Sequence, residues 1–176
     1  MALEELRIPY TVHPVSLASG EQRSAAHKKL HPLGQLPVLV DGDTVVFESV
    51  AICLYLGDRC PERGLAPALE SPDRAAYLQW CTFVPGSLEP AILAAFLRSQ
   101  GCRLWPGMPE LAQVLGVLAA PIERHRYLLP RGFSMPDVLL GPTLDVIERH
   151  GVALPTALSA YLTRLRGRPS FAIAHS

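Results

Sequence analysis

Glu48 and Ser49 are the residues whose position most directly suggests chemistry. They stand where a β-rich run ends and a helical pattern begins. A helix N-terminus presents unpaired N–H groups and a partial positive charge, which together favour a carboxylate. Ser49 adds a hydroxyl donor, and Glu48 offers an acceptor for an ammonium group. The pair is therefore able to hold the amino-acid end of a zwitterion, although an N-cap serine beside a solvated acid explains the local pattern more simply.

A proline at the start of a β-rich run is the second unusual feature. Pro37 follows Gln35 and Leu36 there. Because proline cannot donate to a strand ladder, local statistics favour a trans proline at an edge strand. His27 and His31 lie four residues apart, but no further ligand has the spacing of a metal site. We therefore predict no bound metal.

The elements that must position these residues can be predicted from the chain around them. The runs Leu36–Val40 and Thr44–Phe47 flank Asp41 and Gly42, and Asp-Gly tolerates the positive φ of a tight turn. This pattern predicts a β-hairpin. Apolar residues then recur at helical spacing, which predicts a helix with Ser49 as its N-cap.

The predicted secondary structure differs before and after this hairpin and its following helix. Before it, we predict a short helix over residues 2–7, an extended strand over Tyr10–Val15 and a loosely helical segment over residues 21–30. After it come a proline-rich linker and no further strand pattern. Helical periodicity covers residues 73–100, 109–128, 137–149 and 156–166. A small α/β half therefore precedes an all-helical half.

Some residues of the helical half have both a structural and a functional interpretation. Ser134 and Asp137 have the spacing of a capping box, which stabilises a helix start and has no catalytic role. An aromatic row on the first helix either packs in the core or lines an apolar ligand pocket; it consists of Tyr77, Trp80 and Phe83. The last basic residues indicate a solvated helix end; they are Arg164, Arg166 and Arg168.

Composition excludes several classes of protein. Of 176 residues, 49% are apolar and 18% are charged, which excludes a disordered chain. Sixteen basic residues balance sixteen acidic ones, so neither nucleic acid nor an anionic membrane is predicted as a partner. No run approaches the ~18 apolar residues of a membrane helix, and the N-terminus lacks a secretory pattern. We predict a cytoplasmic protein with four reduced cysteines.

The ordered set of motifs resembles the cytosolic glutathione S-transferase family. The matching segments are His31–Val40, Asp41–Asp43, Phe47–Ser49, Phe133–Val138 and Tyr161–Pro169. The resemblance implies an α/β plus all-α fold. A thioredoxin-like N-terminal domain would occupy residues 1–66, a linker residues 67–72 and an all-helical C-terminal domain residues 73–176.

The resemblance also assigns roles to the site residues. It implies that Pro37 is cis and that the backbone of Leu36 pairs with the cysteinyl part of glutathione. Glu48 and Ser49 would hold the γ-glutamyl end, and Gln35 would make a further contact. Glutathione is then a co-substrate, and no metal is expected. The expected partners are a small hydrophobic electrophile and a second copy of the chain in a homodimer.

Glutathione transfer requires activation of a thiol, because a free thiol has a pKa near about 8.5. In the family, a Tyr, Ser or Cys after the first strand provides this activation. Met1 falls inside the matching first helix, so we expect the first strand to be missing from this sequence and the catalytic residue to lie upstream of Met1. The resemblance thus implies a glutathione-conjugating enzyme; the alternative is a catalytically impaired glutathione-binding or interaction module.

Overall fold

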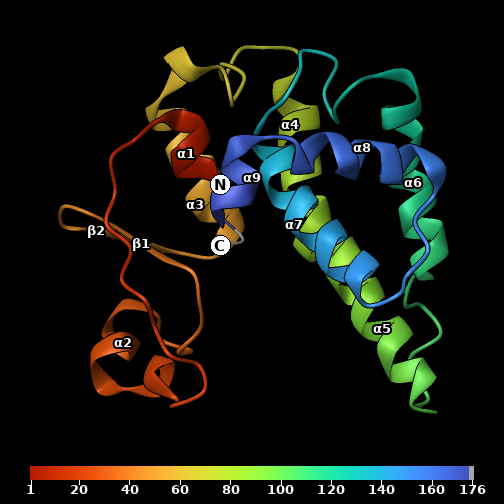
Figure 1. Ribbon diagram of the computed structural model, residues 1–176, viewed down its shortest axis with the longest axis horizontal. Helices are drawn as coiled ribbons and strands as arrows, with labels where there is room; N and C mark the ends of the chain where they lie inside the picture. The colour runs from red at the N-terminus through yellow and green to blue at the C-terminus, as the bar shows by residue number, and fades with distance from the viewer. Residues whose placement is uncertain (175–176) are drawn as a thin grey trace.

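The computed structural model describes residues 1–174 and shows an α/β half beside a helical half (Figure 1). The first half contains α1 (Ala2–Leu6), the 3-10 turn η1 (Glu21–Arg23), α2 (Ala25–Leu30), β1 (Val38–Asp41), β2 (Thr44–Phe47), α3 (Ser49–Arg59) and the 3-10 turn η2 (Pro61–Arg63). The second half contains α4 (Arg74–Phe83), the π-helical turn η3 (Val84–Leu88), α5 (Glu89–Ser99), α6 (Leu111–Arg124), α7 (Met135–Arg149), α8 (Thr156–Arg166) and α9 (Pro169–Ala174). The predicted fold class is confirmed, whereas the domain limits at residues 66 and 72 stay a prediction.

The predicted hairpin is present and forms the sheet of the described residues. Strands β1 and β2 pair antiparallel, with Val38 opposite Phe47 and Asp41 opposite Thr44. Gly42 takes the first of the two turn positions with φ of 59°, a conformation that glycine adopts without steric cost. This register fixes which residues meet at the other end of the hairpin.

The predicted strand over Tyr10–Val15 is wrong, because this segment is irregular and pairs with no other described strand. A hollow of about 790 Å³ lies between it and the outer edge of β1. The lining includes Tyr10 and His13 from this segment and Val38 and Val40 from β1. The backbone of the segment therefore pairs with no described strand, and a strand needs such a partner.

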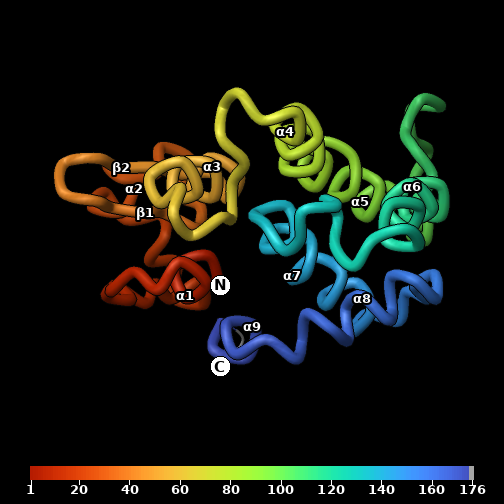
Figure 2. The backbone as a smooth tube through the Cα atoms, turned by 90° about the horizontal axis from the view of Figure 1, so that it is seen from above, coloured from red at the N-terminus to blue at the C-terminus, as the bar shows by residue number. Residues whose placement is uncertain are grey.

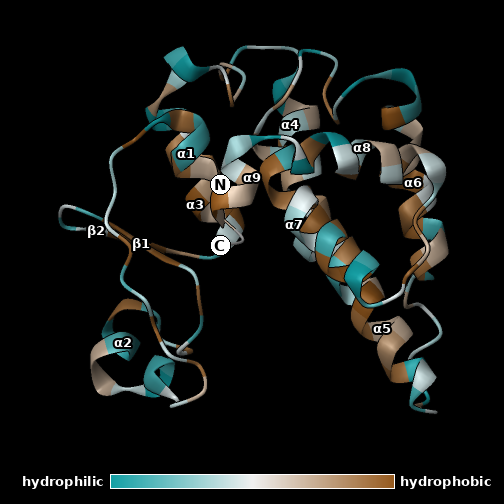
Figure 3. Ribbon diagram, in the orientation of Figure 1, coloured by the Kyte–Doolittle hydropathy of each residue, from teal (hydrophilic) through white to brown (hydrophobic). Residues whose placement is uncertain are grey.

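A continuous helical stretch from Arg74 to Ser99 carries the helical half. It is long and apolar enough, by length and composition, to cross a membrane, which differs from our prediction. Figure 3 shows apolar residues along α5, but the inner side of the stretch belongs to the protein core through Tyr77, Leu88 and Ala91. Proline removes a backbone donor and should divide a helix, and Pro85 lies in the π-helical turn that separates α4 from α5. Pro121 and Pro142, in contrast, lie inside α6 and α7 without dividing them.

One hydrophobic core joins the two halves. Leu6 and Leu56 from the first half and Tyr77, Met135 and Tyr161 from the second belong to the same buried cluster. The Met135 N–H also donates to the Leu65 carbonyl at 3.0 Å, which ties α7 to the end of the first half. Helix α3 packs against both strands of the hairpin on one side and against α7 on the other, so it connects the hairpin to the helical half.

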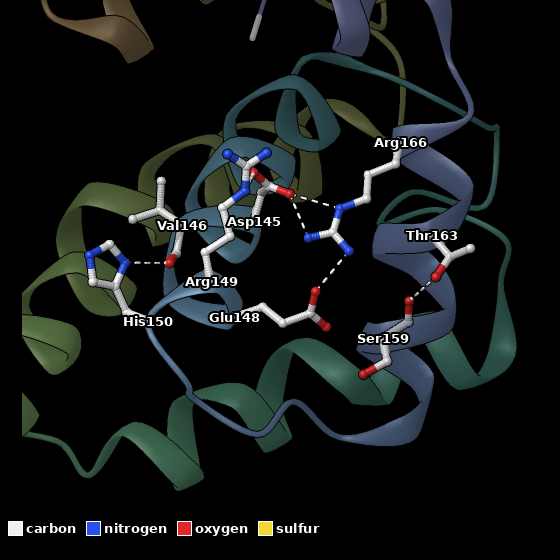
Figure 4. A network of polar contacts seen from close by, with 8 residues as sticks. All are labelled: Asp145, Val146, Glu148, Arg149, His150, Ser159, Thr163 and Arg166. Atoms are coloured by element: carbon white, nitrogen blue, oxygen red, sulfur yellow. Dashed lines mark hydrogen bonds and ion pairs between the residues drawn. The ribbon is translucent and has the colours of Figure 1, made fainter.

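Helices α7 and α8 are linked by an ionic network rather than ending in solvent (Figure 4). The Asp145 carboxylate is almost fully buried and bonds Arg166 at 2.6 Å and Arg149 at 2.8 Å. Arg166 also reaches Glu148 at 2.7 Å. The prediction of a solvated helix end is therefore wrong for Arg166, because a buried carboxylate requires a cationic partner.

The first and last helices, α1 and α9, lie side by side (Figures 1 and 2). Arg168 binds the Glu5 carboxylate through Nε at 2.7 Å and Nη2 at 2.5 Å. Its guanidinium also stacks over the Phe133 ring at 3.6 Å from the ring centroid. Arg168 is thus a link between α1 and the end of the helical half, not the solvated residue that we predicted.

Candidate functional site

The predicted site residues meet at the open end of the hairpin, away from its turn. Pro37 directly precedes β1, and Glu48 directly follows β2. Because Val38 is paired with Phe47, the ladder places Pro37 and Glu48 at the same end of the two strands. Helix α3 begins at the next residue, Ser49. Two segments that are eleven residues apart in sequence are therefore brought together by the strand register.

The N-terminus of α3 offers donors to a bound carboxylate. The Ile52 N–H makes the first helical bond, to the Glu48 carbonyl at 3.0 Å. The N–H groups of the three preceding residues have no acceptor one turn back in the helix. Ser49 and Glu48 are both exposed. Our prediction placed the N-cap at Ser49, whereas the N-cap is Glu48 and Ser49 is the first helical residue.

Glu48 has a backbone conformation that the sequence did not reveal. Its φ of 71° and ψ of 122° lie in a region that residues other than glycine seldom adopt. Such a conformation costs on the order of 1–3 kcal/mol and is typically found at functional sites. It directs the chain sharply from β2 into α3 while leaving the Glu48 carboxylate exposed.

The segment before β1 presents its backbone to solvent. The Leu36–Pro37 peptide bond is cis, as the resemblance implied and local statistics did not. The side chains of Gln35 and Pro37 are exposed, and Leu36 retains 44% of its accessible surface. These three residues therefore form an open rim beside Glu48.

Two buried histidines, His27 and His31, form hydrogen bonds to the segment before β1. His27, 8% exposed, lies with its Nε2 2.9 Å from the Gln35 carbonyl oxygen. His31, 2% exposed, packs on the Phe47 ring, and its Nδ1 accepts the Leu33 N–H at 3.3 Å. We had considered this pair only as possible metal ligands. In residues 1–174, no group of His, Cys, Asp and Glu side chains is arranged to hold a metal ion.

Gly34 lets the same segment approach η1 closely. A Cβ at this position would lie 2.6 Å from the Gln22 carbonyl oxygen, and the Gly34 φ is 64°. Both the space and the conformation therefore require glycine. The turn from His31 to Leu36 is thus held between α2, η1 and β2.

The thiols and phenols whose pKa values are shifted are poor sources of a thiolate or phenolate. Burial raises the pKa of the Cys53 thiol to about 12, and it raises the pKa of Cys81 further. The Tyr10 hydroxyl donates to Glu4 at 2.7 Å, and this hydrogen bond raises the Tyr10 pKa. All four cysteines are free. Cys53, Cys81 and Tyr10 therefore favour the neutral form near pH 7.

An apolar groove of about 490 Å³ lies between α5 and α7. Much of its lining comes from Ile92, Leu93, Phe96 and Val146.

The aromatic row that we considered as a pocket lining is not part of this groove. Tyr77 is fully buried in the core, whereas Trp80 and Phe83 are half-buried and meet edge to face. The core interpretation therefore holds for Tyr77.

Comparison with known proteins extends over both halves of the chain. The family model of the glutathione S-transferase N-terminal domain matches residues 1–59. Glutathione S-transferase 3 from Zea mays is 31% identical over 187 aligned residues, which cover 96% of this chain and 83% of that relative. Glutathione S-transferase Z2 from Arabidopsis thaliana is 38% identical over 90 residues, or 51% of this chain, and this match spans only 40% of the length of that relative.

A solved structure gives the same result for the fold. A sphingomonad glutathione S-transferase complexed with glutathione has a TM-score of 0.80 and 25% identity, covering 98% of this chain and 89% of that one. The first half is thus thioredoxin-like and the second half helical, as predicted.

Proposed function

Because this chain belongs to the glutathione S-transferase family, we propose that it binds glutathione at the junction of β2 and α3 and transfers the glutathione sulfur to an electrophile. The observation that carries this proposal is the strand register. It joins the exposed rim of Gln35, Leu36 and Pro37 to the exposed N-terminus of α3.

In this proposal, each part of glutathione has a matching group in the site. The γ-glutamyl carboxylate accepts hydrogen bonds from the Ser49 hydroxyl and from the free N–H groups of α3. The Glu48 carboxylate binds the γ-glutamyl ammonium group through a charge-assisted hydrogen bond. The Leu36 backbone pairs with the cysteinyl residue, and Gln35 makes a further contact. The solved glutathione complex of the related sphingomonad protein supports this choice of ligand.

The transfer step would form a carbon–sulfur bond. Glutathione loses its thiol proton to solvent, and the thiolate attacks the electrophilic carbon. A leaving group then departs with its electron pair, or an activated double bond takes up a proton. The residues of the site bind and orient glutathione, so that its reaction with a bound electrophile becomes effectively unimolecular.

A second function, glutathione binding without efficient transfer, is favoured by one observation. The Tyr10 hydroxyl already donates to the Glu4 carboxylate at 2.7 Å, and the Cys53 and Cys81 thiols are buried in the core. None of these three groups therefore offers a free donor to a bound thiolate. Measuring binding and turnover separately on the same chain distinguishes the two functions.

The remaining partners are also part of the proposal. The apolar groove between α5 and α7 fits a small hydrophobic electrophile. A homodimer is supported by the apolar character of Arg74–Ser99, on which Leu78 remains 39% exposed. A cytoplasmic location agrees with the four free thiols.

Glu48→Ala should weaken glutathione binding about 10- to 100-fold, because one charge-assisted hydrogen bond contributes about 1.5–3 kcal/mol. Isothermal titration calorimetry with reduced glutathione measures this effect. Glu70→Ala, which removes another exposed acid outside the site, should leave the Kd unchanged. Absence of binding by the parent chain, or equal binding by Glu48→Ala, would contradict the proposed site.

Phe96→Ala should raise the KM for an apolar aryl chloride several-fold, because it removes apolar surface of the groove that would contact the electrophile. The KM for glutathione should not change. Trp105→Ala serves as the control, since Trp105 is 75% exposed and lies outside the groove lining. An equal change in both variants would remove the groove from the proposal.

A further inference from the structure

His27 lies on α2, away from the residues to which we assign glutathione, yet it bonds directly to their backbone. Its side chain is 8% exposed, and its Nε2 is 2.9 Å from the carbonyl oxygen of Gln35. Because a carbonyl can only accept, Nε2 must carry the proton and donate it to this bond. Gln35 directly precedes Leu36, so the restraint acts on the segment that would pair with the cysteinyl residue.

The helix that carries His27 is itself well fixed. Ser24 caps α2, and its Oγ accepts the His27 N–H at 3.1 Å. At the other end, the His31 N–H donates to the His27 carbonyl at 2.9 Å, and the His31 ring packs on Phe47 of β2. The His27 ring is therefore presented from a rigid base.

The segment between the end of α2 and the start of β1 is irregular and mostly exposed. Its early part is tied by the Gly34 N–H, which donates to the His31 carbonyl at 2.8 Å. Its late part, Gln35 and Leu36, has exposed side chains that do not hold it by burial. The bond from His27 thus restrains the part of the segment that packing leaves open.

We propose that His27 is a positioning residue for glutathione: through the bond from its Nε2–H to the Gln35 carbonyl, it holds the Leu36 backbone in the orientation that binds the ligand. This inference rests on the proposed function. Without the bond, the segment samples several conformations, and glutathione binding must order it. One neutral hydrogen bond of this kind corresponds to a change in Kd of about 3- to 10-fold.

The test compares three variants of the full chain by calorimetry with reduced glutathione. His27→Phe keeps a buried ring but removes the donor, and we expect a Kd about 3- to 10-fold higher. His27→Gln places an amide donor at a similar reach, and we expect a Kd within about two-fold of the parent, since the hydrogen bond is restored. His125→Phe, at an exposed histidine on the end of α6, is the matched control and should not change the Kd.

Hydrogen–deuterium exchange without ligand gives a second readout that a general loss of stability would not reproduce. In His27→Phe, exchange should rise in the peptide covering residues 32–37 and stay unchanged in α7. If His27→Phe does not fold, His27→Met takes its place, because methionine fills irregular space without a donor.

Equal Kd values for the parent and His27→Phe would overturn the inference, as would a failure of His27→Gln to restore binding. Both results leave the proposed function standing, because the parent still binds glutathione. If the parent chain does not bind glutathione, the proposed function fails and the positioning role fails with it.

Discussion

Replacing Asp137 with asparagine should lower the free energy of unfolding by about 3 kcal/mol, because buried donors lose a carboxylate that serves several of them at once. The Asp137 side chain is fully buried. It accepts hydrogen bonds from the Leu128 N–H at 3.1 Å, the Tyr161 hydroxyl at 2.8 Å and the Ser134 N–H at 2.8 Å. In asparagine, one carboxylate oxygen is replaced by an NH2 group, which would point its own donor at one of these three donors.

Two effects of this substitution oppose each other. Burial raises the pKa of the Asp137 carboxyl, while hydrogen bonds from Leu128, Tyr161 and Ser134 lower it, so the neutral amide relieves part of the cost of a buried charge. The unpaired donors cost more, because each loses its partner in a place without access to water. The capping box that the sequence predicted is therefore also an anchor between α7, α8 and the segment before them.

Urea unfolding followed by circular dichroism measures the Asp137 effect. Tyr161→Phe removes a single donor and should cost about 1 kcal/mol, and Asp43→Asn at the exposed hairpin turn should change stability by less than about 0.5 kcal/mol. A loss below about 1 kcal/mol in Asp137→Asn would show that solvent or a local shift satisfies the donors.

Arg168→Leu should lower the free energy of unfolding by about 2 to 3 kcal/mol, because it leaves the Glu5 carboxylate partly buried without its counter-charge. The Glu5 side chain is 12% exposed, and Arg168 also stacks on Phe133. Arg168→Lys keeps the charge but loses the two-pronged bond and the stacking, so we expect an intermediate loss of about 1 kcal/mol.

The same pair predicts a dependence of stability on pH. Burial acts to raise the Glu5 pKa, but hydrogen bonds from Arg168 and Ser170 and the nearby positive charge bring it below 4.5. A lowered pKa in the folded state contributes stability that is present above the unfolded pKa and is lost as the pH falls through the folded one. The stability difference between the parent and Glu5→Gln should therefore shrink below about pH 4.5.

Urea unfolding of both chains at neutral pH and at about pH 3 tests this expectation. An unchanged difference at the lower pH would mean that the Glu5 carboxylate contributes no ionic stabilisation.

Local patterns predicted the elements that depend on local chemistry. The Asp41-Gly42 turn signal predicted the hairpin, and the spacing of Ser134 and Asp137 predicted the start of α7. The periodicity over residues 156–166 gave α8 with the limits that the structure has. In each case, a turn residue, a cap or a single apolar face determines the element without help from distant residues.

What the sequence did not predict depends on partners far along the chain or on the junction of two elements. Arg168 lies 163 residues from Glu5, and His27 reaches a backbone carbonyl that carries no residue-specific signal. The positive φ of Glu48 arises where β2 must turn into α3, and no propensity favours it in a glutamate. The strand expected over Tyr10–Val15 has the right composition but no neighbour with which to pair.

The contact between α1 and α9 has a consequence for how the protein is made. A ribosome synthesises Glu5 well before Arg168, so 163 residues must be added after Glu5 before the two can meet. Until then, α1 lacks its ionic anchor, and closing so long a loop carries an entropic cost that later packing must offset. Helix α1 therefore gains this anchor only after translation has passed Arg168, and a nonsense codon before that position would remove it.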